Sequence, residues 1–118
     1  MASRHGWIGV DLDRTLAHED GFIDLLTIGT PIPEMVAKVK RAMEEGYEIR
    51  IFTARVSHPD SQLTQQITVA IQDWCYQNLG VRFMVTNCKD FNMLEIWDDR
   101  CVQVESNTGE FVGESGLI

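Results

Sequence analysis

Apolar residues along the chain gather into four short runs, and each run is bounded by polar residues. The first run covers residues 7–12, and the others cover 48–53, 81–85 and 94–97. Apolar runs of this length with polar boundaries are typical of strands buried in a parallel sheet. The pattern therefore predicts four strands.

Two longer stretches between these runs have helical spacing. From Pro33 to about Glu45, apolar residues recur every three or four positions, which predicts an amphipathic helix. A second helix is expected to start near Asp60 or Ser61 and to end at Gly80. The two apolar stripes consist of Ile32, Val36, Val39 and Met43, and of Leu63, Ile67, Ala70, Ile71 and Trp74.

The alternation of strands and helices defines the expected fold. Residues 16–32 show no sustained period and are interpreted as a loop or a small hairpin, and residues 101–112 as a C-terminal β-hairpin. We expect one domain over residues 1–118: an α/β, three-layer α/β/α Rossmann-like sandwich with a mostly parallel sheet.

Polar side chains follow the predicted strands at the point where each one ends. An acidic pair ends the first strand, a hydroxyl the second, and another acidic pair the fourth, with a lysine shortly before it. These residues are Asp11, Asp13, Thr53, Lys89, Asp98 and Asp99. Because the carboxyl ends of parallel strands share one edge of the sheet, we expect them to converge on one crevice.

Such a crevice has the groups that phosphoryl transfer needs. Asp11 could attack phosphorus as a carboxylate, and Asp13, two residues along an extended chain, could reach the leaving oxygen. Carboxylates approach an anionic phosphate only when cations intervene. Lys89 would supply one, and a magnesium ion held by Asp11 and Asp98 or Asp99 the other.

Four motifs in this order resemble those of the haloacid dehalogenase-like (HAD) superfamily of phosphatases and phosphotransferases. Residues 11–15 match the pattern DxDxT, Thr53 follows an apolar strand, Lys89 comes next, and the acidic pair 98–99 comes last. The resemblance covers nearly the whole chain. Because dehalogenases lack the second Asp of the first motif, it favours a phosphatase.

The resemblance implies a role for each of these residues. Asp11 would be the nucleophile, and Asp13 the general acid that later activates water. Thr53 and Lys89 would bind the transferring phosphoryl group, and Lys89 would also orient Asp11. The implied cofactor is Mg²⁺, with ligands from Asp11, the backbone carbonyl of Asp13, Asp98 and Asp99.

Two further features bear on the substrate. Arg55, just after Thr53, is interpreted either as a contact for the substrate phosphate or as a surface charge. The stretches 16–32 and 53–89 leave no room for the cap domain that many superfamily members insert, so a capless member is expected. Such an open site either takes a substrate with a large body or is covered by a lid from a partner subunit. The second case would require an oligomer, so a homo-oligomer is one of the expected possibilities.

The composition limits the partners and the cellular compartment that we expect. The net charge of −8 argues against nucleic-acid binding through clustered basic residues, and no sequence-specific DNA binding is expected. Three cysteines, no apparent signal peptide and no long apolar run favour a cytoplasmic protein that does not contact the membrane.

The sequence therefore predicts a Mg²⁺-dependent phosphohydrolase that acts through an aspartyl-phosphate intermediate. Its substrate would be a phosphorylated small molecule or a polynucleotide end. Two alternatives stay open: a non-catalytic HAD-fold module that binds magnesium and phosphate, and a phosphotransferase with an acceptor other than water.

Overall fold

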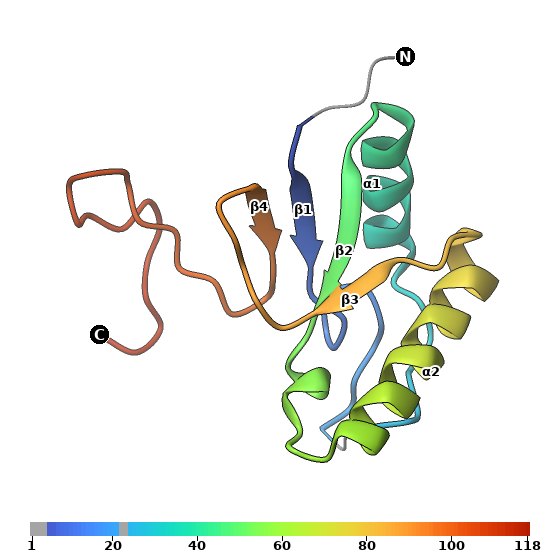
Figure 1. The fold of residues 1–118 in the computed structure, drawn as a ribbon. Helices are drawn as coiled ribbons and strands as arrows, with labels where there is room; N and C mark the ends of the chain where they lie inside the picture. The colour runs from blue at the N-terminus through green and yellow to red at the C-terminus, as the bar shows by residue number, and fades with distance from the viewer. Residues whose placement is uncertain (1–4, 22–23) are drawn as a thin grey trace.

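The chain forms one four-stranded sheet with two long helices (Figure 1). The structure is a computed structural model and describes residues 5–21 and 24–118. Its elements are β1 (Trp7–Val10), α1 (Pro33–Glu44), β2 (Glu48–Phe52), the 3-10 helix η1 (Ala54–Ser57), α2 (Ser61–Leu79), β3 (Met84–Thr86) and β4 (Met93–Trp97).

All neighbouring strands in the sheet run parallel, in the order β3-β2-β1-β4. β1 is central, so Val10 pairs with Ile51 on one side and with Trp97 on the other. The predicted α/β class with a parallel sheet is thus confirmed. The strands also end at one common edge, as the expected crevice requires.

The core lies between the sheet and the two helices. Ile8, Val10 and Ile51 from the sheet share one buried cluster with Val39 of α1 and Ile71 of α2. β1 is buried along its whole length and has a strand on each side. Its last residue therefore holds the following turn in a fixed position.

On the other face of the sheet, Trp7 is fully buried although it lies outside this cluster. The guanidinium of Arg50 lies over its ring, 4.5 Å from the centroid, and the indole Nε1 donates to Asp90 Oδ1 at 3.0 Å. This hydrogen bond lowers the pKa of the exposed Asp90 carboxyl and attaches the loop before β4 to β1.

The ends of the helices agree with the sequence. The Asp60 side chain caps α2 by accepting from the amides of Gln62 and Leu63, and Gly80 ends it in the left-handed region at φ +80°. α1 begins with Pro33 in its first turn, as expected.

Four predicted elements are shorter than expected, and two of them, β1 and β2, end at Val10 and Phe52 instead of at residues 12 and 53. β3 begins at Met84 and not at residue 81, because Phe83 is buried in the core cluster and its carbonyl accepts from the Gln72 side chain at 2.9 Å. In the predicted C-terminal hairpin, one bridge joins Val104 and Phe111, without regular strands.

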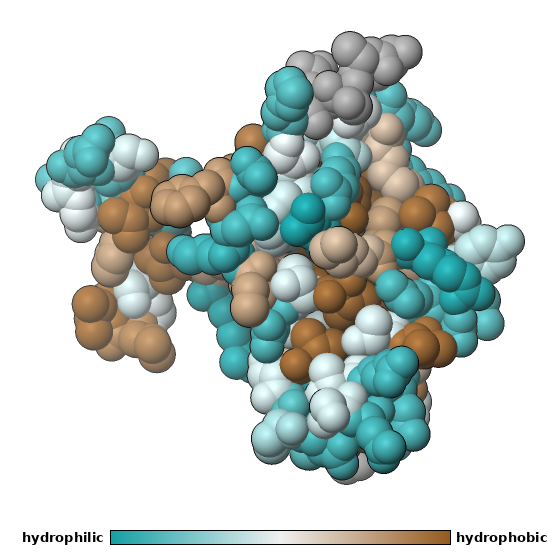
Figure 2. All heavy atoms as spheres, viewed as in Figure 1, coloured by the Kyte–Doolittle hydropathy of each residue, from teal (hydrophilic) through white to brown (hydrophobic). Residues whose placement is uncertain are grey.

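The remaining segments are loops. Within residues 16–32, the described part forms a loop that is fastened where Ala17 bridges Pro31, whereas residues 22 and 23 lie outside the described residues. Residues 101–118 extend away from the sheet and carry apolar side chains on their surface (Figures 1 and 2). Among the described helices, none combines the length and the apolar character needed to cross a membrane.

Candidate functional site

Three carboxylates meet where β1 and β4 end. The amide of Asp11 donates to the carbonyl of Trp97 at 2.9 Å, which continues the ladder between the two strands by one residue. Asp98 and Asp99 follow directly. One oxygen each from Asp11, Asp98 and Asp99 lies within 4.8 Å of the others. The predicted convergence of these three residues is therefore observed.

Thr15 joins the two ends of this acidic cluster. Its Oγ1 donates to Asp11 Oδ2 at 3.1 Å and accepts from the amide of Asp99 at 3.2 Å. The turn that presents Thr15 is anchored by Leu12 and Leu16, whose side chains are fully buried. The hydroxyl of the first motif thus orients the carboxylate of Asp11 in a fixed direction.

The acidic cluster is electrostatically unfavourable without a cation. Burial, followed by the charge of Asp98, raises the pKa of Asp11 to about 7, against the opposing hydrogen bond from Thr15. A nearby divalent cation would offset this repulsion, and a set of carboxylate oxygens is what Mg²⁺ prefers. The donor set of Asp11, Asp98 and Asp99 therefore fits such an ion.

Asp13 lies beside this cluster and is held by Arg55. Arg55 Nε donates to Asp13 Oδ2 at 2.8 Å, and its Nη2 donates to Asp13 Oδ1 at 2.7 Å. Arg55 is only 5% exposed, so it is not a surface charge. Its Nη1 donates to the backbone carbonyls of Asp24, Leu25 and Thr27. The structure thus shows it bound to protein groups.

Thr53 occupies the predicted position at the end of β2. Its amide donates to the Thr86 carbonyl at 3.0 Å, and its Oγ1 accepts from the Arg55 amide at 3.1 Å. Thr53 is buried and lines the same cavity as Asp11 and Asp13.

This cavity, of about 410 Å³, contains most of the predicted site. Asp11, Asp13, Thr53, Asp98 and Asp99 all line it. Its walls also include seven residues that were not predicted: Arg14, Glu19, Phe52, Ala54, Ser57, Asn87 and Arg100. Asn87 directly follows β3, so its position after a strand could have indicated it; Arg14 and Arg100 flank the acidic motifs.

Arg14 adds a positive charge next to the acidic cluster. Its Nε donates to Asp99 Oδ2 at 3.0 Å, and its backbone adopts a φ of +67°, in the left-handed region. This conformation directs the chain into the tight turn that presents Thr15, and the ion pair fixes Asp99 from outside the cluster.

Lys89 is not brought to this cavity. It is exposed and lines a neighbouring cavity of about 1090 Å³, together with Phe91 and Cys101. The proposed contact of Lys89 with the phosphoryl group stays a prediction.

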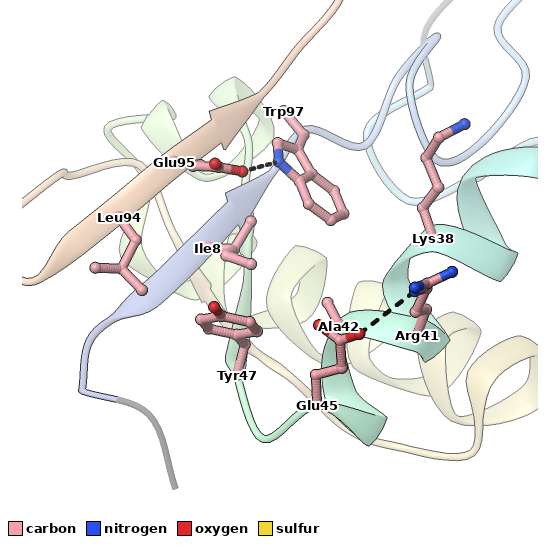
Figure 3. A pocket seen from close by; sticks show the side chains of 9 residues that line it. All are labelled: Ile8, Lys38, Arg41, Ala42, Glu45, Tyr47, Leu94, Glu95 and Trp97. Atoms are coloured by element: carbon pink, nitrogen blue, oxygen red, sulfur yellow. Dashed lines mark hydrogen bonds and ion pairs between the residues drawn. The ribbon is translucent and has the colours of Figure 1, made fainter.

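A third cavity, of about 490 Å³, lies between α1 and β4 and contains none of the predicted site residues (Figure 3). Ile8, Leu94 and Trp97 line it, and the Trp97 indole donates to Glu95 Oε1 at 2.8 Å. Lys38 and Arg41 of α1 lie on the opposite wall. The cavity lacks the cluster of carboxylates that distinguishes the site around Asp11.

Comparison with known proteins adds no relative: no family model, curated protein or solved structure matches the chain. The functional interpretation therefore depends on the geometry of the site.

Proposed function

We propose that the protein is a Mg²⁺-dependent phosphohydrolase that acts through a phosphoryl-enzyme intermediate on Asp11. The observation that carries the proposal is the acidic cluster, in which three carboxylates from two strand ends lie within 4.8 Å. Asp11 and Asp98 are half-buried and Asp99 is exposed, and like charges held this close together repel one another unless a cation compensates them. Its place at the carboxyl edge of a parallel sheet is where such folds bind ligands.

In this proposal Asp11, Asp98 and Asp99 hold the metal. Mg²⁺ would neutralise the charge between the carboxylates and the phosphate and polarise the phosphoryl oxygens.

The reaction would proceed in two steps on the side chains of the cavity. In the first, a carboxylate oxygen of Asp11 forms a bond to phosphorus while the bond to the leaving oxygen breaks, and Asp13 gives that oxygen a proton. In the second, Asp13 takes a proton from water, whose oxygen attacks phosphorus and releases Asp11. Thr15 would orient the nucleophile, because its hydroxyl already binds Asp11 Oδ2.

Arg14 and Arg100 would supply positive charge to a phosphate in this cavity, beside the contribution predicted for Lys89. Both line the cavity that contains Asp11, whereas Lys89 lines another. A phosphate in the cavity would therefore be neutralised by arginines from the turn after β1 and the segment after β4.

The position of Lys89 also favours a second candidate, a module that binds magnesium and phosphate without turnover. The superfamily's motif expects a lysine beside the nucleophile, and this cavity has none among its lining residues. Both candidates share the metal site, and only turnover distinguishes them.

A panel assay tests the proposal. Phosphate release is measured from phosphorylated metabolites and from 5′- and 3′-phosphorylated oligonucleotides, with Mg²⁺ and with EDTA. We expect Mg²⁺-dependent release from one class of compound, which Asp11→Asn abolishes. The exposed Asp73→Asn variant on α2 is the control with the same loss of charge. Binding of Mg²⁺ without release from any compound would support the non-catalytic module.

A further inference from the structure

Arg55 is the only charged residue that is buried in the described part of the chain. It is 5% exposed, and each of its three side-chain nitrogens donates a hydrogen bond. Nε and Nη2 bind the two oxygens of Asp13 as a fork, which is the geometry that gives an arginine its strongest pairing with a carboxylate. One edge of the guanidinium is thus bound to Asp13, which the proposed function makes a catalytic residue.

The other side binds a loop that is distant in sequence. Nη1 donates to the carbonyls of Asp24, Leu25 and Thr27 at 2.9, 3.1 and 2.8 Å. Three carbonyl oxygens directed at one nitrogen form a small cup, and without the guanidinium these partly buried acceptors would lose this partner. The loop backbone therefore depends on Arg55 for its hydrogen bonds.

Other contacts show that the loop is anchored independently on its far side. Leu25 and Ile28 pack against the core, and the Trp74 indole donates to the Gly29 carbonyl at 2.9 Å. Among the described residues, Arg55 is the side chain whose hydrogen bonds join this loop to Asp13.

We infer that Arg55 is a positioning residue: it holds Asp13 and the backbone of residues 24–27 together as one unit and does not contact the substrate. The catalytic part of this inference rests on the proposed function, whereas the coupling between Asp13 and the loop does not. A lysine cannot replace Arg55, because an ammonium lacks the planar fork that reaches both oxygens and the carbonyl cup at once.

The coupling is tested without any activity measurement. Hydrogen exchange of a peptide covering residues 24–30 is compared in the wild type, Arg55→Lys, Arg55→Gln and Asp13→Asn. We expect exchange about tenfold faster in all three variants, because each breaks charge-assisted hydrogen bonds of this unit. Arg41→Gln is the matched control, since Arg41 of α1 forms an exposed ion pair with Glu45. Exchange unchanged from the wild type would overturn the inference.

The role in catalysis is tested by a double-mutant cycle on a substrate found in the panel assay. We expect Arg55→Gln to lower kcat about tenfold or more in the wild-type background, but less than about threefold in the Asp13→Asn background. An equal loss in both backgrounds, with a raised KM, would instead identify Arg55 as a substrate contact and contradict the inference.

The two failures are distinguishable. If no compound is hydrolysed but exchange in residues 24–30 responds as expected, the proposed function fails and the coupling stands. If hydrolysis depends on Asp11 but the cycle is additive, the positioning role fails alone. Arg55→Lys keeps the buried positive charge, so it provides the comparison if Arg55→Gln does not fold.

Discussion

At the residue scale, the proposed function depends most on the side chain of Asp11. Burial and the nearby charge of Asp98 disfavour the ionised form of its carboxyl, whereas the hydrogen bond from Thr15 favours that form. Burial and Asp98 together have the larger effect, so the pKa of Asp11 is about 7 when no cation is bound. The fold therefore leaves the negative charge of this carboxylate uncompensated, as is common for groups at functional sites.

This pKa predicts how stability depends on pH. An unfolded Asp titrates near pH 4, so between about pH 4 and 7 the folded state holds a proton that the unfolded state has lost. The contribution of Asp11 to the free energy of unfolding therefore falls as pH rises through this window and then levels off. In EDTA, Asp11→Asn should remove this fall.

Urea unfolding at pH 5 and pH 8 measures the effect. We expect Asp11→Asn to stabilise the metal-free protein by about 1–2 kcal/mol more at pH 8 than at pH 5, a figure reduced for the partial exposure of the carboxyl. Asp73→Asn should show no such difference. Equal effects of Asp11→Asn at the two pH values would mean that Asp11 titrates normally.

The residue types and their positions in the sequence predicted which side chains meet at the sheet edge, but not which hydrogen bonds and ion pairs they form there. Asp11, Asp98 and Asp99 were predictable because carboxylates after parallel strands share one edge. The burial of Arg55 was not, since arginine is rarely buried and its partners lie 28 to 42 residues away in the sequence. No local pattern contains that pairing.

At the scale of elements, α2 is held to the sheet by one stripe of its surface. Ile67, Ile71 and Cys75 are fully buried along this stripe, and burial raises the pKa of the Cys75 thiol to about 12. Val69, on the same helix, is 49% exposed. The stripe and not the helix as a whole should therefore carry the packing energy.

Two truncations on α2 compare the two sides. Ile71→Ala should lower the free energy of unfolding by about 2–4 kcal/mol, because it removes buried methyl groups and leaves a cavity. Val69→Ala should change it by less than about 0.5 kcal/mol. Urea unfolding of both variants gives the values. Similar losses for the two would contradict the described packing of α2.

Helices and their ends were predictable from sequence because their signals are local. Asp60 and Gly80 mark the ends of α2 by their own side-chain and backbone chemistry. The start of β3 was misplaced because Phe83 is buried in the core and its carbonyl binds the Gln72 side chain of α2, and these tertiary contacts compete with strand pairing. Strand limits depend on such contacts more than helix ends do.

At the scale of the whole molecule, the sheet and its helices contain the buried core, whereas the C-terminal segment, residues 101–118, contributes nothing to it. All members of the buried core cluster fall between Ile8 and Phe83, and none comes from residues 101–118. That segment keeps Val104, Phe111 and Val112 on its surface. The fold of the sheet and the acidic cluster should therefore not depend on it.

Removal of residues 101–118 tests this separation. We expect the Tm to change by less than about 4 °C, since a shift of that size corresponds to about 1 kcal/mol in a domain of this length. Calorimetric titration with Mg²⁺ should give an unchanged Kd. A larger loss of Tm would show that the segment packs on the body in solution.

The central claim is that Asp11 accepts a phosphoryl group, and trapping that group tests it most directly. A reactive phosphomonoester is mixed with the protein and Mg²⁺, the reaction is quenched in acid, and peptides are mapped by mass spectrometry. We expect one added phosphoryl group on the peptide that contains Asp11, lost with EDTA and in Asp11→Asn. Turnover with no phosphoryl adduct, or an adduct that persists in Asp11→Asn, would contradict the account.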